Sequence, residues 1–168
     1  EYIYKVVSIF PVKNNKNEVS FSYDENDSAV TLELSDKIID QYDLHRGKIV
    51  DREQFNTLKD LEQISRAYNK ALKYLSIKDY TEYQMRKKLM DSGDYDDAQL
   101  DATIQLLSEK NLINDKMYAM NYFKRCTRLG IGHNKAIYNL RNYGIETEII
   151  DMCLEELDDD EEYQAALL

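Results

Sequence analysis

The sequence predicts a mainly α protein with a small N-terminal β-rich region, in which tandem three-helix repeats stack into an elongated, curved array. Three observations lead to this prediction. Apolar residues alternate with polar ones in the first third of the chain, and they recur every three or four positions after about residue 51. A helix, glycine, helix phrase also occurs twice, about fifty residues apart, which is typical of repeat proteins.

Residues 1–50 are expected to form the β-rich region. Apolar and polar residues alternate in 18–23 (EVSFSY) and in 29–34 (AVTLEL), which is the pattern of half-buried strands. The segment between them, DENDS at 24–28, favours a turn, so the two strands are expected to pair as an antiparallel hairpin. Residues 4–10, YKVVSIF, are expected to form a third strand.

A short helix is expected after the hairpin, in the segment SDKIIDQY, with Ser35 as its N-cap. Gly47 marks the turn that follows this helix. From about Asp51 onward the chain is expected to be helical, because the sequence has one proline, Pro11, and it lies far upstream.

Residues 51–110 are expected to form the first three-helix repeat. Thr81 and Gln84 make a capping box that begins its second helix, Gly93 ends that helix, and Asp96 caps the third. The first helix has an apolar stripe of Ile64, Tyr68, Ala71, Leu72 and Leu75 and another face of Arg66, Asn69, Lys70 and Lys73. The inward positions of the other two helices are Met85, Leu89, Leu100, Ile104 and Leu107.

Residues 111–157 are expected to form the second repeat. Asp115 begins its first helix, LGIG at 129–132 ends it, and Gly144 ends a short second helix. The first helix has an apolar side of Ala119, Tyr122, Phe123 and Cys126 and an opposite side of Asn121, Lys124, Arg125 and Arg128. The inward positions of the other two helices are Ile137, Leu140, Ile149, Ile150, Leu154 and Leu157.

The two repeats align position by position. A shift of 51 residues places Leu89 on Leu140 and Gly93 on Gly144. After the glycine a shift of 50 aligns the apolar positions of the third helices, which are Leu100, Ile104 and Leu107 with Ile150, Leu154 and Leu157. Because a repeat of this size has a limited core of its own, neighbouring repeats are expected to bury their remaining apolar faces on one another.

Residues 158–168 are expected to be the start of a third, truncated repeat. Asp160 precedes Tyr163 by three residues, as Asp115 precedes Tyr118. The acidic run from Glu155 to Glu162 is interpreted as a solvated junction between repeats rather than as a metal site.

Charge is distributed unevenly along the chain. The net charge is -10, yet the segment from Lys116 to Ile145 contains basic residues and no acidic residue. Its basic residues are Lys116, Lys124, Arg125, Arg128, Lys135 and Arg141. Such an asymmetry can create a local positive field on an acidic molecule.

Three segments are informative because of their order and spacing: YNKALKYLSIKDYTEYQMRKKL at 68–89, LINDKMYAMNYF at 112–123 and YNLRNYGIETEIID at 138–151. Together they resemble the RecX family of bacterial recombination regulators. The resemblance covers roughly residues 60 to 168 and rests on the order and spacing of these segments. The β-rich region before them resembles the variable N-terminal extension of longer family members.

This resemblance implies a cytoplasmic protein that binds the RecA recombinase filament on single-stranded DNA along its helical groove. It also implies that the protein modulates, most often inhibits, recombinase and coprotease activity. Family members commonly carry three repeats, whereas this sequence ends as the third begins, so either further residues follow or the expected reach along the groove is shortened. The family's binding surface is attributed to basic residues, which here are Lys70, Lys73, Arg86, Lys87, Lys124, Arg125, Arg128, Lys135 and Arg141.

The spacing of the basic residues supports the same interpretation. Asn121, Lys124, Arg125 and Arg128 fall at i, i+3, i+4 and i+7, so they share one helix face. Cations on such a face suit phosphates of DNA, which they bind without reading base sequence, or carboxylates of an acidic patch on the recombinase. The alternative for each residue taken singly is an ordinary solvated helix face.

The tyrosines leave two interpretations open. They can stack on exposed bases, or they can pack between helices with their hydroxyl groups at the surface. The residues concerned are Tyr68, Tyr74, Tyr80, Tyr83, Tyr118, Tyr122, Tyr138 and Tyr143.

No enzymatic motif is found in the sequence. It contains no Walker loop, no GxSxG and no HExxH, and Cys126 and Cys153 are interpreted as buried thiols rather than metal ligands, so no cofactor is expected. No apolar run reaches the roughly 20 residues that span a bilayer, and the N-terminus lacks signal-peptide features, so a cytoplasmic protein is expected. The protein is also expected to be a monomer. The alternative to a filament regulator is a helical-repeat adaptor between proteins, without nucleic-acid contact.

Overall fold

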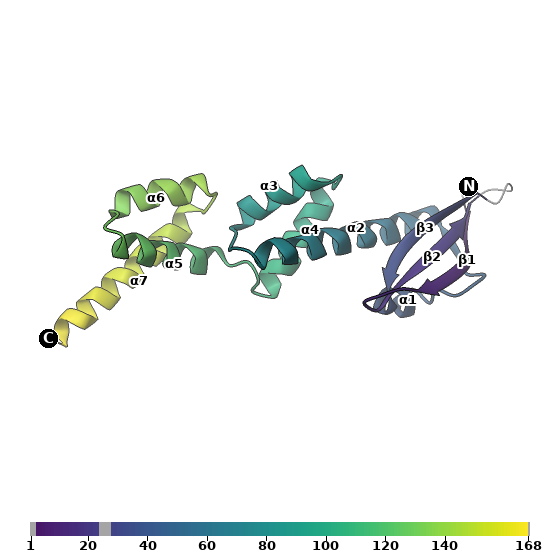
Figure 1. Ribbon diagram of the computed structural model, residues 1–168, viewed down its shortest axis with the longest axis horizontal. Coiled ribbons are helices and arrows are strands. Elements are labelled where there is room, and N and C mark those ends of the chain that lie inside the picture. The colour runs from purple at the N-terminus through teal and green to yellow at the C-terminus, as the bar shows by residue number, and fades with distance from the viewer. Residues whose placement is uncertain (1–2, 24–27, 168) are drawn as a thin grey trace. The chain divides into compact units, whose positions relative to one another are not determined.

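The computed structural model describes residues 3–23 and 28–167, except for the side chains of 162–164. In these ranges it contains four strands and seven helices, and the strands all lie in the N-terminal third of the chain (Figure 1). The predicted class, mainly α with an N-terminal β-rich region, is therefore confirmed. The chain divides into two compact units, Glu1–Arg66 and Ala67–Leu168. None of the described helices combines the length and the apolar character needed to cross a membrane.

The first unit holds an antiparallel sheet with the strand order β3-β2-β1-β4. The predicted hairpin is confirmed, since Val19 lies opposite Leu32, whereas residues 24–27 of its predicted turn lie outside the described residues. Strand β4 escapes prediction because a strand of three residues is too short for an alternating pattern. The strands are β1 Ile3–Pro11, β2 Lys16–Ser22, β3 Ala29–Ser35 and β4 Ile49–Asp51.

Two helices accompany this sheet. Helix α1, Asp36–Gln41, begins as predicted at Ser35, whose side chain accepts a backbone hydrogen bond from the first turn. Helix α2, Arg52–Leu75, begins at a capping box in which Asp51 and Gln54 each accept a hydrogen bond from the backbone of the other. The C-terminal part of α2 belongs to the second unit.

The core of the first unit lies between one face of the sheet and the start of α2. The ring of Phe55 stacks on Tyr4, with centroids 3.9 Å apart, and meets Phe21 edge-on at 5.3 Å. Such aromatic pairs stabilise a core beyond the area that they bury. The buried apolar residues are Val6, Val19, Phe21, Leu32, Leu34, Leu44, Val50, Phe55 and Leu58.

The first repeat consists of the end of α2 with α3, Glu82–Ser92, and α4, Asp97–Glu109. Both predicted caps are confirmed, because Thr81 and Asp96 each form a complete capping box with the glutamine three residues later. The buried apolar residues of this repeat are Ala67, Ala71, Met85, Leu89, Leu100, Leu107 and Ile113.

The packed face of α2 differs in part from the predicted one. Leu72, predicted to point inward, is 37% exposed, while Lys70, predicted on the polar face, is half-buried. The ammonium group of Lys70 donates a 2.9 Å hydrogen bond to the carbonyl oxygen of Ser92 and lies over the ring of Tyr95. Ala71 is fully buried and belongs to the core. Of its two neighbours in sequence, Lys70 lies toward the packed side of α2 and Leu72 lies toward solvent.

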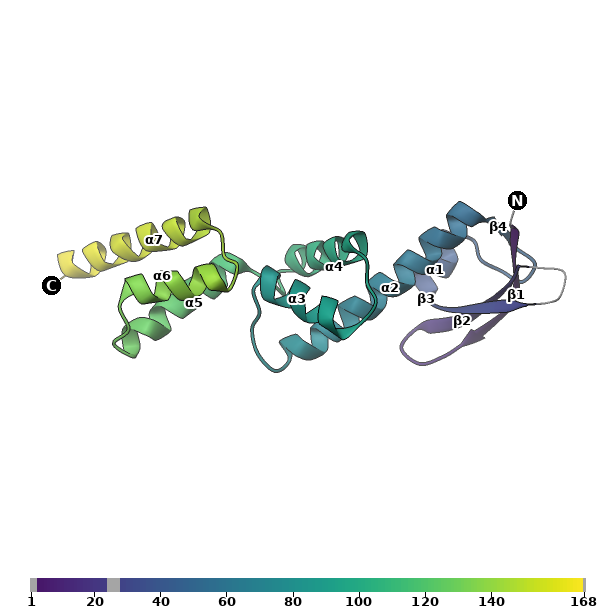
Figure 2. The ribbon, with the colours of Figure 1, turned by 90° about the horizontal axis from the view of Figure 1, so that it is seen from above.

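The second repeat consists of α5, Asp115–Arg128, α6, His133–Asn142, and α7, Thr147–Ala166, which pack on one another in both views (Figure 1, Figure 2). Its buried apolar residues are Ala119, Tyr122, Phe123, Cys126, Ala136, Leu140, Ile145, Ile150 and Cys153. This set contains all four residues of the apolar side predicted for α5. Cys126 and Cys153 are both free and buried, as predicted, and burial raises the pKa of the Cys153 thiol.

The predicted alignment of the two repeats places similar environments on each other at most apolar positions, although Leu107 is fully buried and its aligned partner Leu157 is half-buried. Leu89 and Leu140 are both fully buried, and Leu100 and Ile150 are both buried to within about one per cent. The aligned glycines differ, however. Gly93 has an extended backbone with φ -173°, whereas Gly144 is left-handed with φ +81°.

Helix α7 continues without a break to Ala166. Residues 158–166 therefore extend the third helix of the second repeat, and a third repeat beginning at 158–168 stays a prediction. The acidic side chains that the structure describes between Glu155 and Glu161 are all exposed, in keeping with a solvated segment.

Candidate functional site

The two repeats meet where α3 begins and α6 ends. The hydroxyl of Thr81 donates a 2.6 Å hydrogen bond to the carbonyl oxygen of Tyr143, 62 residues away in sequence. The backbone N–H of Glu82 donates a 2.9 Å hydrogen bond to Oδ1 of Asp115. Because Thr81 is fully buried, its hydrogen bond forms where water cannot compete for the carbonyl group.

Gly144 completes this joint between the repeats. Its φ of +81° is strained for any residue with a Cβ, and a Cβ placed there would lie 2.2 Å from the Cβ of Tyr83. Glycine therefore meets two requirements at this position: a left-handed backbone and the close approach of α3.

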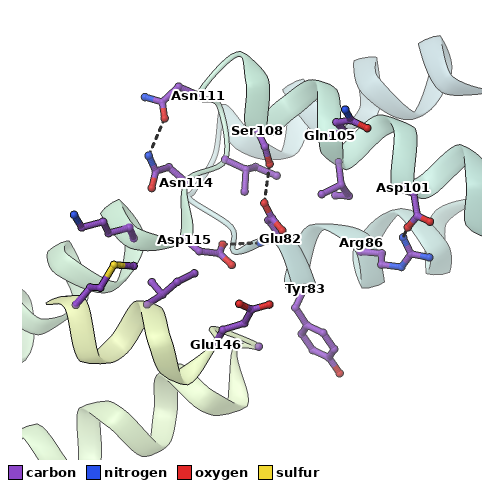
Figure 3. Close-up of a pocket in the computed structure, with 16 residues that line it drawn as sticks. Glu82, Tyr83, Arg86, Asp101, Gln105, Ser108, Asn111, Asn114, Asp115 and Glu146 are labelled. Atoms are coloured by element: carbon purple, nitrogen blue, oxygen red, sulfur yellow. Dashed lines mark hydrogen bonds and ion pairs between the residues drawn. The ribbon is translucent and has the colours of Figure 1, made fainter. Parts of the chain in front are cut away.

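A cleft of about 900 Å³ opens beside the joint (Figure 3). Its lining combines apolar side chains with carboxylates. The apolar residues include Ile104, Ile113, Ile149 and Met152, and the carboxylates include Glu82, Asp101, Asp115 and Glu146. Figure 3 shows Glu82, Asp115 and Glu146 around the same part of the cleft. We refer to it as the inter-repeat cleft.

The carboxylates of the inter-repeat cleft influence one another. Burial raises the pKa of Asp115 above its ordinary value of 3.8, and the negative charges of Glu82 and Glu146 raise it further. The backbone N–H of Glu82 acts in the opposite direction, because it donates to the Asp115 carboxylate. The Glu82 carboxylate in turn accepts a 2.7 Å hydrogen bond from Ser108.

The basic side chains of the inter-repeat cleft are already paired. Arg86 forms ion pairs with Asp97 and Asp101, and Lys116 forms one with Glu156 at 2.5 Å. The hydrogen bond from Lys116 to Glu156 and the charge of that carboxylate raise the pKa of Lys116. Among the described residues, no group of His, Cys, Asp or Glu side chains is arranged to hold a metal ion.

The nine basic residues that the sequence singles out have different surroundings. Lys70 and Arg86 are half-buried and bound to groups of their own repeat, as described above. The other seven are exposed, and they are Lys73, Lys87, Lys124, Arg125, Arg128, Lys135 and Arg141. Sequence spacing alone could not separate the two kinds, because a salt bridge between α3 and α4 depends on how those helices pack.

The exposed side of α5 carries Asn121, Lys124, Arg125 and Arg128, and we call it the α5 basic face. The guanidinium group of Arg125 lies 5.1 Å from the ring centroid of Tyr122. Arg128 lines two hollows, one of about 410 Å³ that also contains Asp79 and one of about 580 Å³ that also contains Glu161. Both acids lie outside the acid-free segment, so folding brings negative charge closer to this face than the sequence indicates.

Most of the tyrosines pack between helices. Tyr118, Tyr122 and Tyr143 form a cluster with centroids 5.7–6.5 Å apart, and the Tyr122 hydroxyl accepts a 2.8 Å hydrogen bond from Asn139. Tyr68, Tyr74 and Tyr80 lie against the core of the first repeat. The exposed tyrosines of the second unit are Tyr83, at 53%, and Tyr138, at 66%, among the residues that the structure describes.

Comparison with known proteins places this arrangement in a family. A family model described as "RecX, first three-helix domain" matches residues 67–107. A curated "Regulatory protein RecX" of Clostridioides difficile is 30% identical over 151 residues, which are 84% of this chain and 70% of that protein. Another of Clostridium perfringens strain SM101 is 30% identical over 162 residues, 96% of this chain and 74% of that protein.

Solved structures show the same fold. A crystal structure of a regulatory protein RecX superposes with a TM-score of 0.71 at 24% sequence identity, and the match covers 92% of this chain and 74% of that one. A crystal structure of RecX from Lactobacillus salivarius superposes with a TM-score of 0.51 at 32% identity, and the match covers 56% of this chain and 61% of that one.

Fold and comparisons together define a regulatory protein in which two groups of three helices follow a small β-sheet along the chain. The chain belongs to the RecX family.

Proposed function

We propose that this protein binds the filament that RecA recombinase forms on single-stranded DNA and inhibits its recombinase and coprotease activities. Membership of the RecX family is the observation that carries the proposal. The exposed cations of the α5 basic face support it, because they offer phosphate contacts on a chain whose net charge is otherwise strongly negative.

Binding is proposed to need both components of the filament. With a net charge of -10, the chain as a whole is repelled by bare nucleic acid, and only a limited face is free to approach it. Contacts to the recombinase along the repeats therefore supply much of the affinity, and the basic residues add a salt-dependent part. No catalytic step by this chain is proposed; it acts by occupying the filament.

Co-sedimentation tests the proposal. The protein is mixed with RecA filaments assembled on single-stranded DNA, with RecA alone and with DNA alone, and its retention is measured at rising salt concentration. Retention by the filament and weak retention by bare DNA support the proposal. No retention by the filament, or equal retention by bare DNA, contradicts it.

The α5 basic face is tested by changing Lys124, Arg125 and Arg128 together to Ala. Each phosphate contact to a single strand contributes roughly 0.7 to the slope of log affinity against log salt, so losing all three contacts should reduce that slope by about 2. The control changes three exposed lysines of the first unit, Lys5→Ala, Lys13→Ala and Lys37→Ala, and alters net charge equally. Equal effects of the two triple variants would mean that only total charge matters.

A further inference from the structure

Helix α6 presents an aromatic ring to solvent. Tyr138 is 66% exposed, more than any other tyrosine that the structure describes. The neighbouring tyrosines Tyr118, Tyr122 and Tyr143 instead contact one another within the core of the same repeat. Because leaving an aromatic ring in water forgoes the free energy of burying it, Tyr138 is a candidate for a contact with another molecule.

The residues around Tyr138 on α6 are cationic or amide-bearing. Lys135 precedes it by three positions and Arg141 follows it by three, and both are exposed. Neither forms an ion pair within the described part of the chain. Asn134 and Asn142, four positions to either side, are exposed too, so the ring lies between two cations and two amides on one helix face.

The helix itself adds positive potential to this face. Gly132 is the N-cap of α6 and supplies no side-chain hydrogen bond, and the first turn contains no acidic residue. The N-terminal amide groups of α6 are therefore not neutralised by a side chain of their own helix, which favours anions near this end.

A stacking ring between unpaired cations matches the chemistry of single-stranded nucleic acid. Such a strand offers flat bases that stack on aromatic side chains and phosphates that Lys and Arg bind, whereas an acidic protein surface would use the cations and leave the ring without a partner. We propose that the exposed face of α6 contacts the single-stranded DNA, with a base stacked on Tyr138 and with Lys135 and Arg141 on flanking phosphates. This inference rests on the proposed function and adds to it a DNA-contacting surface on α6, besides the α5 basic face.

The test compares Tyr138→Ala with Tyr138→Phe, which keeps the ring. The probe is a fluorescein-labelled oligothymidylate, used bare at low salt and, separately, within a RecA filament. Tyr138→Ala should weaken binding to the bare oligonucleotide about tenfold, since the base loses its stacking partner, while Tyr138→Phe stays within about twofold of the unmodified protein. The matched control is Phe10→Ala, because Phe10 is 64% exposed but pairs across the sheet with Glu18 rather than with cations.

A second measurement locates the contact directly. An oligonucleotide carrying 5-iododeoxyuridine is irradiated in the complex, and the cross-linked peptide is identified by mass spectrometry. A cross-link at Tyr138 supports the inference. Unchanged affinity of Tyr138→Ala for the bare oligonucleotide overturns it. It is also overturned if Lys135→Ala and Arg141→Ala weaken retention by the RecA filament and Tyr138→Ala does not, which would indicate an acidic protein partner.

The two measurements, binding to the bare oligonucleotide and retention by the RecA filament, separate this inference from the proposed function. If the unmodified protein is not retained by the RecA filament but Tyr138→Ala still weakens binding to the bare oligonucleotide, the proposed function fails and the DNA-contacting face stands. If the filament retains Tyr138→Ala as well as the unmodified protein and no cross-link forms at Tyr138, the face is wrong and the proposed function stands.

Discussion

At the scale of single residues, Gly144 and its aligned partner Gly93 have different backbone conformations and different neighbours. A Cβ added to Gly93 would lie 3.1 Å from Cε2 of the Tyr95 ring. The backbone of Gly93 is extended, a conformation that any residue adopts. Gly144 is left-handed and lies against the base of Tyr83. The identity of the two glycines could be read from the sequence, but their different backbone conformations depend on the joint between the repeats.

We expect Gly144→Ala to destabilise the protein more than the strain of its backbone alone explains. A left-handed conformation costs a residue with a Cβ roughly 1–2 kcal/mol, and the collision with the Cβ of Tyr83 adds to this cost. Gly130→Ala is the matched control, because Gly130 has φ +74° and nothing within 4 Å of an added Cβ. Urea unfolding measures both variants, and equal losses would show that α3 moves away freely.

The raised pKa of Asp115 predicts a pH dependence of stability. The folded chain holds this proton more tightly than the unfolded chain, so the contribution is fully present below pH 3.8 and is lost as the pH rises through the raised pKa. Asp115→Asn removes the titration and keeps an oxygen that can accept from Glu82. The free energy of unfolding of the unmodified protein, relative to this variant, should therefore fall as the pH is raised from about 3.5 to 7. A constant difference across urea titrations in that range would contradict the expectation.

At the scale of elements, helix beginnings were the most predictable features. Ser35, Thr81 and Asp96 are small polar residues followed by helical periodicity, and all three act as N-caps in the structure. The alternating strands β2 and β3 were equally readable, because one of their faces is buried. These features depend on near neighbours in sequence, which is why a single sequence is enough to find them.

Contacts between elements were harder to predict. The half-buried Lys70 resembles any solvated lysine in sequence, and its partner Ser92 is 22 residues away. Likewise, nothing in the spacing of Lys124, Arg125 and Arg128 indicates that Asp79 and Glu161 share hollows with them. The sequence therefore identifies the nine candidate basic residues, but the packing of the helices decides which of them are exposed and available for binding.

Thr81 caps α3 and also bonds it to Tyr143 at the end of α6, and the contribution of both bonds to stability can be measured. Thr81→Val removes both the cap of α3 and the hydrogen bond to Tyr143, so we expect a loss of about 2–3 kcal/mol in the free energy of unfolding. Thr81→Ser keeps the hydroxyl and should lose less than half of that. Asp96→Ala removes a cap without a bond to the other repeat, and it should cost about 1 kcal/mol. If Thr81→Val costs no more than Asp96→Ala, the bond to Tyr143 contributes nothing to stability.

At the scale of the whole molecule, two units with separate cores share one chain. The core of the first unit is assembled from strands and the start of α2, while the second unit has one buried cluster in each three-helix repeat. Helix α2 supplies residues to both, since its Phe55 and Leu58 lie in the first core and its Ala67 and Ala71 in the second. Separate cores allow separate local unfolding.

Hydrogen exchange should reveal this independence. Phe21→Ala truncates a fully buried ring in the first unit and should cost about 3–5 kcal/mol there. We expect faster amide exchange in β1, β2 and β3 and unchanged exchange in α5 and α6. Leu140→Ala, in the core of the second repeat, should give the reverse pattern. Uniform acceleration along the whole chain in either variant would show that the units unfold together.

Glu62 of α2 has a consequence for how these molecules behave at high concentration. It is 92% shielded from solvent, and its carboxylate accepts a 2.5 Å hydrogen bond from the backbone N–H of Glu33 on β3, the outermost strand of the sheet. A donor used in this way cannot join a ladder with a strand of another molecule. The side chain thus keeps this part of the outer edge of β3 from pairing with a strand of another copy.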